Sequence, residues 1–195
     1  MSFSVRVVGV DPSMNNFGIV VADVDIYSPT FDFEIVSMTL VQSGNEAKAK
    51  KTIRKNSDDL RRAKLLYDGF QQACNEAQFA FIEVPVGSQS ARAMASYGMC
   101  IGVLASCPIP IIEMTPTEVK LAGTGVRTAT KGEMIEAAIA AHPEGKWLTR
   151  KLRGSLEYTN ANEHLADACF AIKAGLKTPE FRTATALLKA ARKVA

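Results

Sequence analysis

The chain has 195 residues, of which 47% are apolar and 22% are charged, and its formal net charge is +3. This composition excludes an intrinsically disordered chain, and the length suits a single domain over residues 1–195 that buries one core. The small net charge alone selects no class of partner.

Two apolar runs open the chain and predict a β-hairpin. Residues 4–11 end at Asp11, and Pro12 keeps Asp11 out of the helical region, so the carboxylate is expected at the end of a strand. A short turn leads to a second strand at residues 18–22, and a third strand follows at 33–42. The polar segment that comes next is expected to form a loop.

The middle of the chain alternates helix and strand. A helix is expected to start at Ser57, with an apolar face formed by Leu60, Ala63, Leu66 and Phe70. A strand over residues 80–83 then ends at Glu83. Ser88 to Ser90 precede another helix, which carries a stripe of small residues: Ala95, Gly98, Gly102 and Ala105. We expect this stripe to pack on the sheet; the alternative is a two-fold helix contact between subunits.

Residues 93–112 carry no charge, but their glycines and prolines predict a buried helix followed by a strand at 109–114 rather than a membrane span. The four cysteines lack Cys-x-x-Cys spacing, so reduced core thiols and a cytoplasmic protein are expected: Cys74, Cys100, Cys107 and Cys169. The N-terminus starts directly with strand-like sequence and shows no secretion leader.

The last third is predicted to contain helices near residues 130–141, around His164 and from about residue 180. Apolar residues after His164 recur at helical spacing, so His164 and Asp167 share one face of their helix. Glu163 should point about 100° away and is expected in solvent. His142, at an apparent helix end, is expected to have a capping or surface role.

Carboxylates that end apolar strands cost desolvation energy unless a cation compensates them. Asp11 and Glu83 end two such strands, and His164 with Asp167 adds a helical pair. Together the four residues favour a site for divalent metal. Each residue alone is more often a solvated turn or a helix cap.

Two segments concentrate positive charge, residues 48–55 and residues 146–153. Phosphate contact and a merely solvated surface both remain open for each segment. A helix N-terminus with Ser88, Gln89, Ser90 and Arg92 follows the Glu83 strand and is another candidate for phosphate contact. The Gly123-Thr124-Gly125 sequence predicts a turn, but the pattern of a nucleotide-binding loop is missing.

The predicted order of elements resembles the ribonuclease H-like α/β fold, which has a central five-stranded mixed sheet flanked by helices. This order is three hairpin-like strands, a helix, alternating strands and helices, and a late helix that carries acids. Within that group the chain resembles the RuvC-type Holliday junction resolvases. The resemblance covers nearly the whole length and rests on residues 8–13, 81–83, 119–120, Lys131 and 164–168. Val84-Pro85-Val86 replaces the aromatic residue that many members carry there, which would suit a phage-borne member.

The resemblance implies a homodimeric, metal-dependent endonuclease that nicks branched DNA, chiefly four-way junctions, at symmetric positions. Asp11 would bridge two cations, Glu83 would support one, and His164 with Asp167 would complete the other shell. The cations would be Mg²⁺, with Mn²⁺ able to substitute. Lys120 and Lys131 match lysines of the family and would contact phosphate or stabilise charge. The expected DNA-contacting residues are Ser88, Gln89, Ser90, Arg92, Lys120, Lys131, Lys50, Lys51 and Arg54.

Two other functions on the same core fold stay open. An actin-like nucleotide-binding protein needs two lobes to enclose its nucleotide, and this chain has length for one. A nuclease-inactive DNA-binding module would use the scaffold without cutting, and the presence of all four candidate ligands argues against it.

Overall fold

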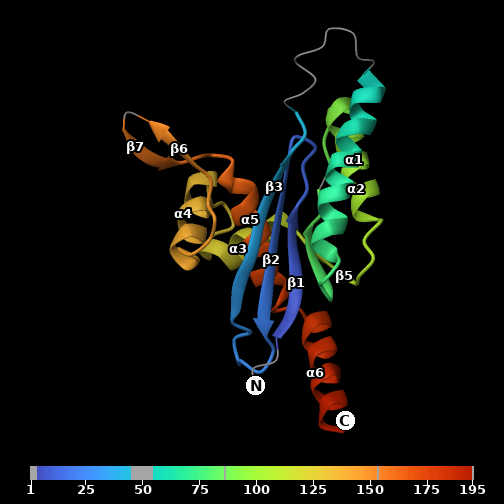
Figure 1. Cartoon of the computed structure of the whole chain (residues 1–195), viewed down its shortest axis with the longest axis vertical. Helices are drawn as coiled ribbons and strands as arrows, with labels where there is room; N and C mark the ends of the chain where they lie inside the picture. Colours follow the sequence, from blue (N-terminus) through green and yellow to red (C-terminus); the bar gives the residue numbers. More distant parts are fainter. Residues whose placement is uncertain (1–3, 45–54, 86, 153, 195) are drawn as a thin grey trace.

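The computed structural model describes residues 4–44, 55–85, 87–152 and 154–194. Its centre is a five-stranded sheet in the order β3-β2-β1-β4-β5 (Figure 1). The strands, with their bounds, are β1 (Ser4–Asp11), β2 (Asn16–Asp25), β3 (Phe33–Gln42), β4 (Phe79–Glu83) and β5 (Ile111–Met114). The first three strands pair antiparallel, whereas β4 pairs parallel with β1 and β5 pairs parallel with β4. The expected mixed sheet is therefore confirmed.

Helices cover both faces of the sheet. On one face lie α1 (Lys55–Cys74) and α2 (Ala91–Leu104), and on the other lie α3 (Pro116–Thr124), α4 (Lys131–Ala141) and α5 (Asn162–Gly175) (Figure 1). Alternate residues of β1 enter the two apolar clusters: Val7 packs with α5, and Val8 packs with α1. The middle of each central strand is therefore largely apolar, because both of its faces are buried.

The C-terminal half contains two elements that the sequence patterns did not predict. Helix α3 starts with a capping box in which Thr115 and Glu118 exchange hydrogen bonds. The expected Gly-Thr-Gly turn is the end of this helix: Gly123 packs against Phe170, and Gly125 is a left-handed C-cap. The second unforeseen element is a two-stranded ribbon of β6 (Thr149–Leu152) and β7 (Ser155–Tyr158). Helix α6 (Pro179–Val194) ends the chain.

The inward face of α1 differs from the expected one. Leu60 is 72% exposed, although the sequence placed it on the apolar face. The buried positions at its start are Asp59 and Arg62, which precede Leu66 and Phe70 on the same side of the helix. Because Asp59 and Arg62 take the inward positions in the first turns of α1, Leu60 lies on the outward side of the helix.

The small-residue stripe on α2 faces solvent, which corrects the expectation that it packs on the sheet. A Cβ atom added at Gly98 or Gly102 would meet no atom within 4 Å. Met94 and Ile101 lie on the same side and are 46% and 47% exposed. The larger side chains of Cys100, Val103 and Leu104 pack on the sheet instead.

Helix α5 lies directly on β1 and β2 because glycines leave room for its backbone. A Cβ at Gly9 would come within 2.1 Å of the Ala168 carbonyl oxygen, and a Cβ at Gly18 would come equally close to the carbonyl oxygen of His164. The lack of a side chain at these two strand positions therefore determines how closely α5 approaches the sheet.

Replacing Gly18 with alanine should lower the free energy of unfolding by about 3 kcal/mol or more, because the added methyl group must displace the backbone of α5. Chemical denaturation measures this loss. The control is Gly132→Ala on α4, where the new Cβ meets open space and the unfolding free energy should rise by up to about 1 kcal/mol. Equal stability of Gly18→Ala and the unmodified chain would contradict the close approach.

Other expectations from the sequence are met. The four cysteines are free thiols, and Cys74, Cys100 and Cys169 are buried. His142 is the C-cap of α4, with its ring against that of Phe33. None of the helices within the described ranges is long and apolar enough to cross a membrane.

Candidate active site

The four candidate ligands come from three neighbouring elements. Asp11 and Glu83 are the last residues of β1 and β4, which are adjacent and parallel, so both carboxylates lie at one edge of the sheet. His164 and Asp167 lie in the first two turns of α5, the helix that packs on β1. The Nδ1 nitrogen of His164 donates a hydrogen bond to Asp11 Oδ2 over 2.6 Å.

Glu83 and Asp167 are both destabilised as anions. Burial and the negative charges of Asp11 and Asp167 raise the pKa of Glu83 to about 8, although the charge of Lys120 opposes the rise. Burial and the charges of Asp11 and Glu163 likewise raise the pKa of Asp167 to about 7. At this edge of the sheet the negative charges of the acids therefore outweigh the positive charges that stabilise them.

His164 supplies part of the missing positive charge. Burial lowers the pKa of its imidazole, but the hydrogen bond to Asp11 and the charges of three acids outweigh this, and the net pKa lies above the ordinary value. The side chain is 16% exposed and that of Asp11 is 14% exposed. The two groups therefore form a half-enclosed ion pair at moderately acid pH.

Glu163 lies close to this site, contrary to the expectation that it points into solvent. Its side chain is 18% exposed and accepts a hydrogen bond from Lys131 Nζ over 2.6 Å. Its Oε1 atom is also 3.9 Å from His164 Nε2. Helical periodicity describes only α5, whereas here the first residue of α4 approaches Glu163 from a neighbouring helix.

Two lysines border the site. Lys120 on α3 is half-buried and near enough to lower the pKa of both Glu83 and Asp167. Lys131, the first residue of α4, is held by its hydrogen bond to Glu163, and this bond raises the pKa of Lys131. Both therefore lie beside the acids.

The donor set suits a hard divalent cation. The candidate donors are three carboxylates and one imidazole, at a place where negative charge is in excess. Oxygen-rich donor sets of this kind are those that Mg²⁺ and Mn²⁺ prefer. Among the described residues, however, no three of the histidine, cysteine and acidic side chains are grouped closely enough to hold a metal ion. The chemistry of the donors fits a divalent cation, but one Asp11 oxygen accepts the hydrogen bond from His164 in this structure.

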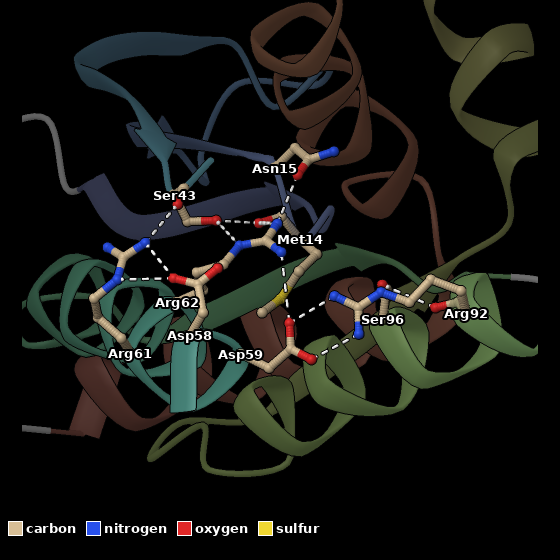
Figure 2. A network of polar contacts seen from close by, with 9 residues as sticks. All are labelled: Met14, Asn15, Ser43, Asp58, Asp59, Arg61, Arg62, Arg92 and Ser96. Carbon is tan, nitrogen blue, oxygen red and sulfur yellow. Dashed lines mark hydrogen bonds and ion pairs between the residues drawn. The ribbon is translucent and has the colours of Figure 1, made fainter. Parts of the chain in front are cut away.

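A buried polar network fixes the loop that follows Asp11 (Figure 2). Arg62 donates to the Met14 carbonyl oxygen over 3.0 Å, to Asn15 Oδ1 over 2.6 Å and to Ser43 Oγ over 3.1 Å. The hydroxyl of Ser43 also donates to the Met14 carbonyl. One arginine of α1 thereby joins the loop after β1 to the end of β3.

The same network reaches the start of α2. Both terminal nitrogens of Arg92 donate to the two oxygens of Asp59 over 2.6 Å each (Figure 2). Arg92 was expected to contact DNA, and in this structure its guanidinium is bonded within the protein. No local sequence pattern indicates this pairing, because 33 residues separate Asp59 from Arg92. DNA contact by Arg92 stays a prediction.

The remaining expected DNA-contacting residues fall into two groups. Ser88, Gln89 and Ser90 are exposed just before α2, and Ser90 is the N-cap of that helix. Lys50, Lys51 and Arg54 lie outside the described residues.

The arrangement defines a ribonuclease H-like fold with clustered acids at one edge of its sheet. A solved structure of Thermus thermophilus RuvC in complex with Holliday junction substrate has this fold. The TM-score is 0.59 and the identity 18%, over 93% of this chain and 97% of that one. A second structure of T. thermophilus RuvC gives a TM-score of 0.59 at 17% identity, over 87% of this chain and 92% of that one.

At this level of identity the likeness shows the fold, and the RuvC-like ribonuclease H arrangement expected from the sequence is confirmed. No family model matches the sequence, and neither does any curated protein. The matched structures come from T. thermophilus and lend no support to a phage-borne source.

Proposed function

We propose that this chain is a metal-dependent endonuclease that resolves Holliday junctions or other branched DNA by paired symmetric nicks, in the cytoplasm of a bacterium or a phage-infected host. The observation that carries the proposal is the convergence of Asp11, Glu83, His164 and Asp167 at one sheet edge of a RuvC-like fold. The RuvC structure bound to a Holliday junction supports the choice of substrate.

In this proposal each side chain has a distinct task. Asp11 would be shared by two divalent ions, Glu83 would hold one, and His164 with Asp167 would hold the other. When bound, the ions would activate a water molecule and stabilise the leaving oxygen of the phosphodiester. Ligation would release Asp11 from its hydrogen bond with His164 and would offset the negative charges that raise the pKa of Glu83 and Asp167.

The positive groups around the acids would hold the DNA backbone. Lys120 and Lys131 border the acids and are proposed to contact the phosphate at the cleavage point or stabilise its charge. The exposed segment Ser88 to Ser90 precedes the N-terminus of α2, where backbone N–H groups favour phosphate. Arg92, Lys50, Lys51 and Arg54 complete the proposed surface.

The proposal includes a homodimer, because two symmetric nicks require two sites. The exposed side of α2 supports it: Met94 and Ile101 flank open space above Gly98 and Gly102, where a second helix can approach closely. We propose that α2 of one subunit packs against α2 of the other.

Ile101→Glu should shift the protein from dimer to monomer in sedimentation equilibrium, because a carboxylate would then face the partner helix. Coordinated nicking of both strands should fall with it. The matched control is Leu187→Glu on α6, which changes a residue of similar kind that is 67% exposed and should leave the dimer intact. Sedimentation of the unmodified chain as a monomer, free and on DNA, would contradict the dimer.

A cleavage panel tests the proposed function as a whole. Four-way, three-way, flap and linear duplex DNA should be incubated with the protein and with Mg²⁺, Mn²⁺ or EDTA. Four-way junctions should be nicked at symmetric positions with either metal and remain intact in EDTA. Binding without cutting in both metals would instead identify a nuclease-inactive DNA-binding module.

A further inference from the structure

The ribbon formed by β6 and β7 stands apart from the main sheet. It projects beyond α4 (Figure 1), and each of its described residues is exposed. Leu156 is 75% exposed and Tyr158 is 53% exposed, although both are apolar enough to favour burial. An isolated two-stranded ribbon is marginally stable in water, so a ribbon that exposes such side chains fits a binding element.

The two faces of the ribbon differ in chemistry. On one face Arg150 lies opposite Glu157, and their side chains form an ion pair of 3.6 Å. On the other face Lys151 lies opposite Leu156, with Tyr158 two residues further along the same strand. No carboxylate pairs with Lys151 within the ranges that the structure describes. We call the surface of Lys151, Leu156 and Tyr158 the ribbon face.

The base of the ribbon is tied to the helix that carries the candidate ligands. The side chain of Asn162, the first residue of α5, accepts from the Leu148 N–H and donates to the Leu148 carbonyl, both over 2.8 Å. The Thr159 N–H donates to the same carbonyl over 3.0 Å. Asn162 is fully buried and stands two residues before His164. The ribbon is therefore fixed relative to the candidate active site.

We infer that the ribbon face binds branched DNA beside the cleavage point, with Lys151 on a backbone phosphate and Tyr158 and Leu156 against a base exposed at the branch. The inference rests on the proposed nuclease function. Residues 146–160 contain four lysines or arginines and a single acid, Glu157, which matches an anionic partner. An exposed aromatic ring next to a free cation is the combination that binds unpaired bases on their backbone.

Fluorescence anisotropy in EDTA tests the inference, with a labelled four-way junction and a linear duplex of the same sequence. Tyr158→Ala should raise Kd for the junction about tenfold, as expected for the loss of one stacked base, and change Kd for the duplex much less. Tyr158→Phe should restore junction affinity. Lys151→Gln should weaken binding to both DNAs and reduce the slope of log K against log salt by about 0.9.

Arg150→Gln is the matched control, since it removes the same charge from the opposite face and should change Kd by less than about threefold. Unchanged junction binding by both Tyr158→Ala and Lys151→Gln would overturn the inference. So would loss of dimer on sedimentation of Tyr158→Ala with DNA affinity intact, which would assign the ribbon face to a second copy of the chain.

A crosslink gives a second readout that does not depend on affinity. A junction with 5-iodouracil at its branch point should crosslink to a peptide that contains Tyr158, and crosslinks that map only to other segments would contradict the inference. The proposed nuclease function is judged separately. If the unmodified chain cuts junctions while the ribbon variants bind them normally, only the ribbon inference fails; if the unmodified chain binds no branched DNA, both fail.

Discussion

Asp11→Asn should reduce the rate of junction cleavage by at least about 10³-fold while junction affinity stays within about threefold of that of the unmodified chain. Asp11 is the residue proposed to be shared by both ions, and it lies within hydrogen-bond distance of His164. The amide keeps the shape of the side chain but removes its charge. Single-turnover cleavage of a labelled junction with Mg²⁺, together with binding measured in EDTA, separates the two effects.

The matched control for this variant is Asp68→Asn. Asp68 is exposed on α1 and is not one of the candidate ligands, so its replacement should leave cleavage unchanged. Loss of junction binding together with cleavage in Asp11→Asn would indicate a structural role for Asp11. Retained cleavage would exclude Asp11 from the chemistry.

Metal-free protein should lose stability as the pH rises from about 5 to 8.5. The unfolded chain releases the protons of Glu83 and Asp167 near pH 4 to 4.5, whereas the folded chain holds them until pH values near 8 and 7. In that window the folded state binds more protons, so raising the pH favours unfolding. Because one pKa unit corresponds to about 1.4 kcal/mol, Tm should fall by on the order of 10 °C.

Divalent metal should reverse this loss, and more strongly at high pH. Ligation requires deprotonated carboxylates, so MnCl₂ should raise Tm more at pH 8.5 than at pH 6. Glu83→Gln isolates the effect from other titrating groups: its metal-free Tm should vary less with pH and respond weakly to Mn²⁺. A pH profile for Glu83→Gln that parallels the profile of the unmodified chain would contradict the raised pKa of Glu83.

The sheet was predictable because its strands carry strong local signals. The run that ends at Asp11 is largely apolar, with Arg6 as its one charged residue before Asp11, and Pro12 after it marks where the strand stops. The helix with His164 and Asp167 has a clear apolar period, which places both residues on one face. Four site residues on strand ends and one helix face could therefore be named before the structure.

Features that depend on contacts between distant segments were not predictable. Glu163 is drawn to the site by Lys131 of another helix, and Arg92 is bonded to Asp59, 33 residues away. The ribbon of β6 and β7 was missed because each of its strands is only four residues long and none of their residues packs on a core. Its residues appeared in the sequence only as a basic segment.

Anomalous scattering from crystals soaked in MnCl₂ tests the central proposal most directly. Two manganese peaks beside Asp11, one within ligand distance of Glu83 and the other of His164 and Asp167, are the predicted result. Crystals of Asp11→Asn grown and soaked in the same way should lose both. Manganese bound only elsewhere on the unmodified protein, with none at this edge of the sheet, would contradict a metal-dependent nuclease centre.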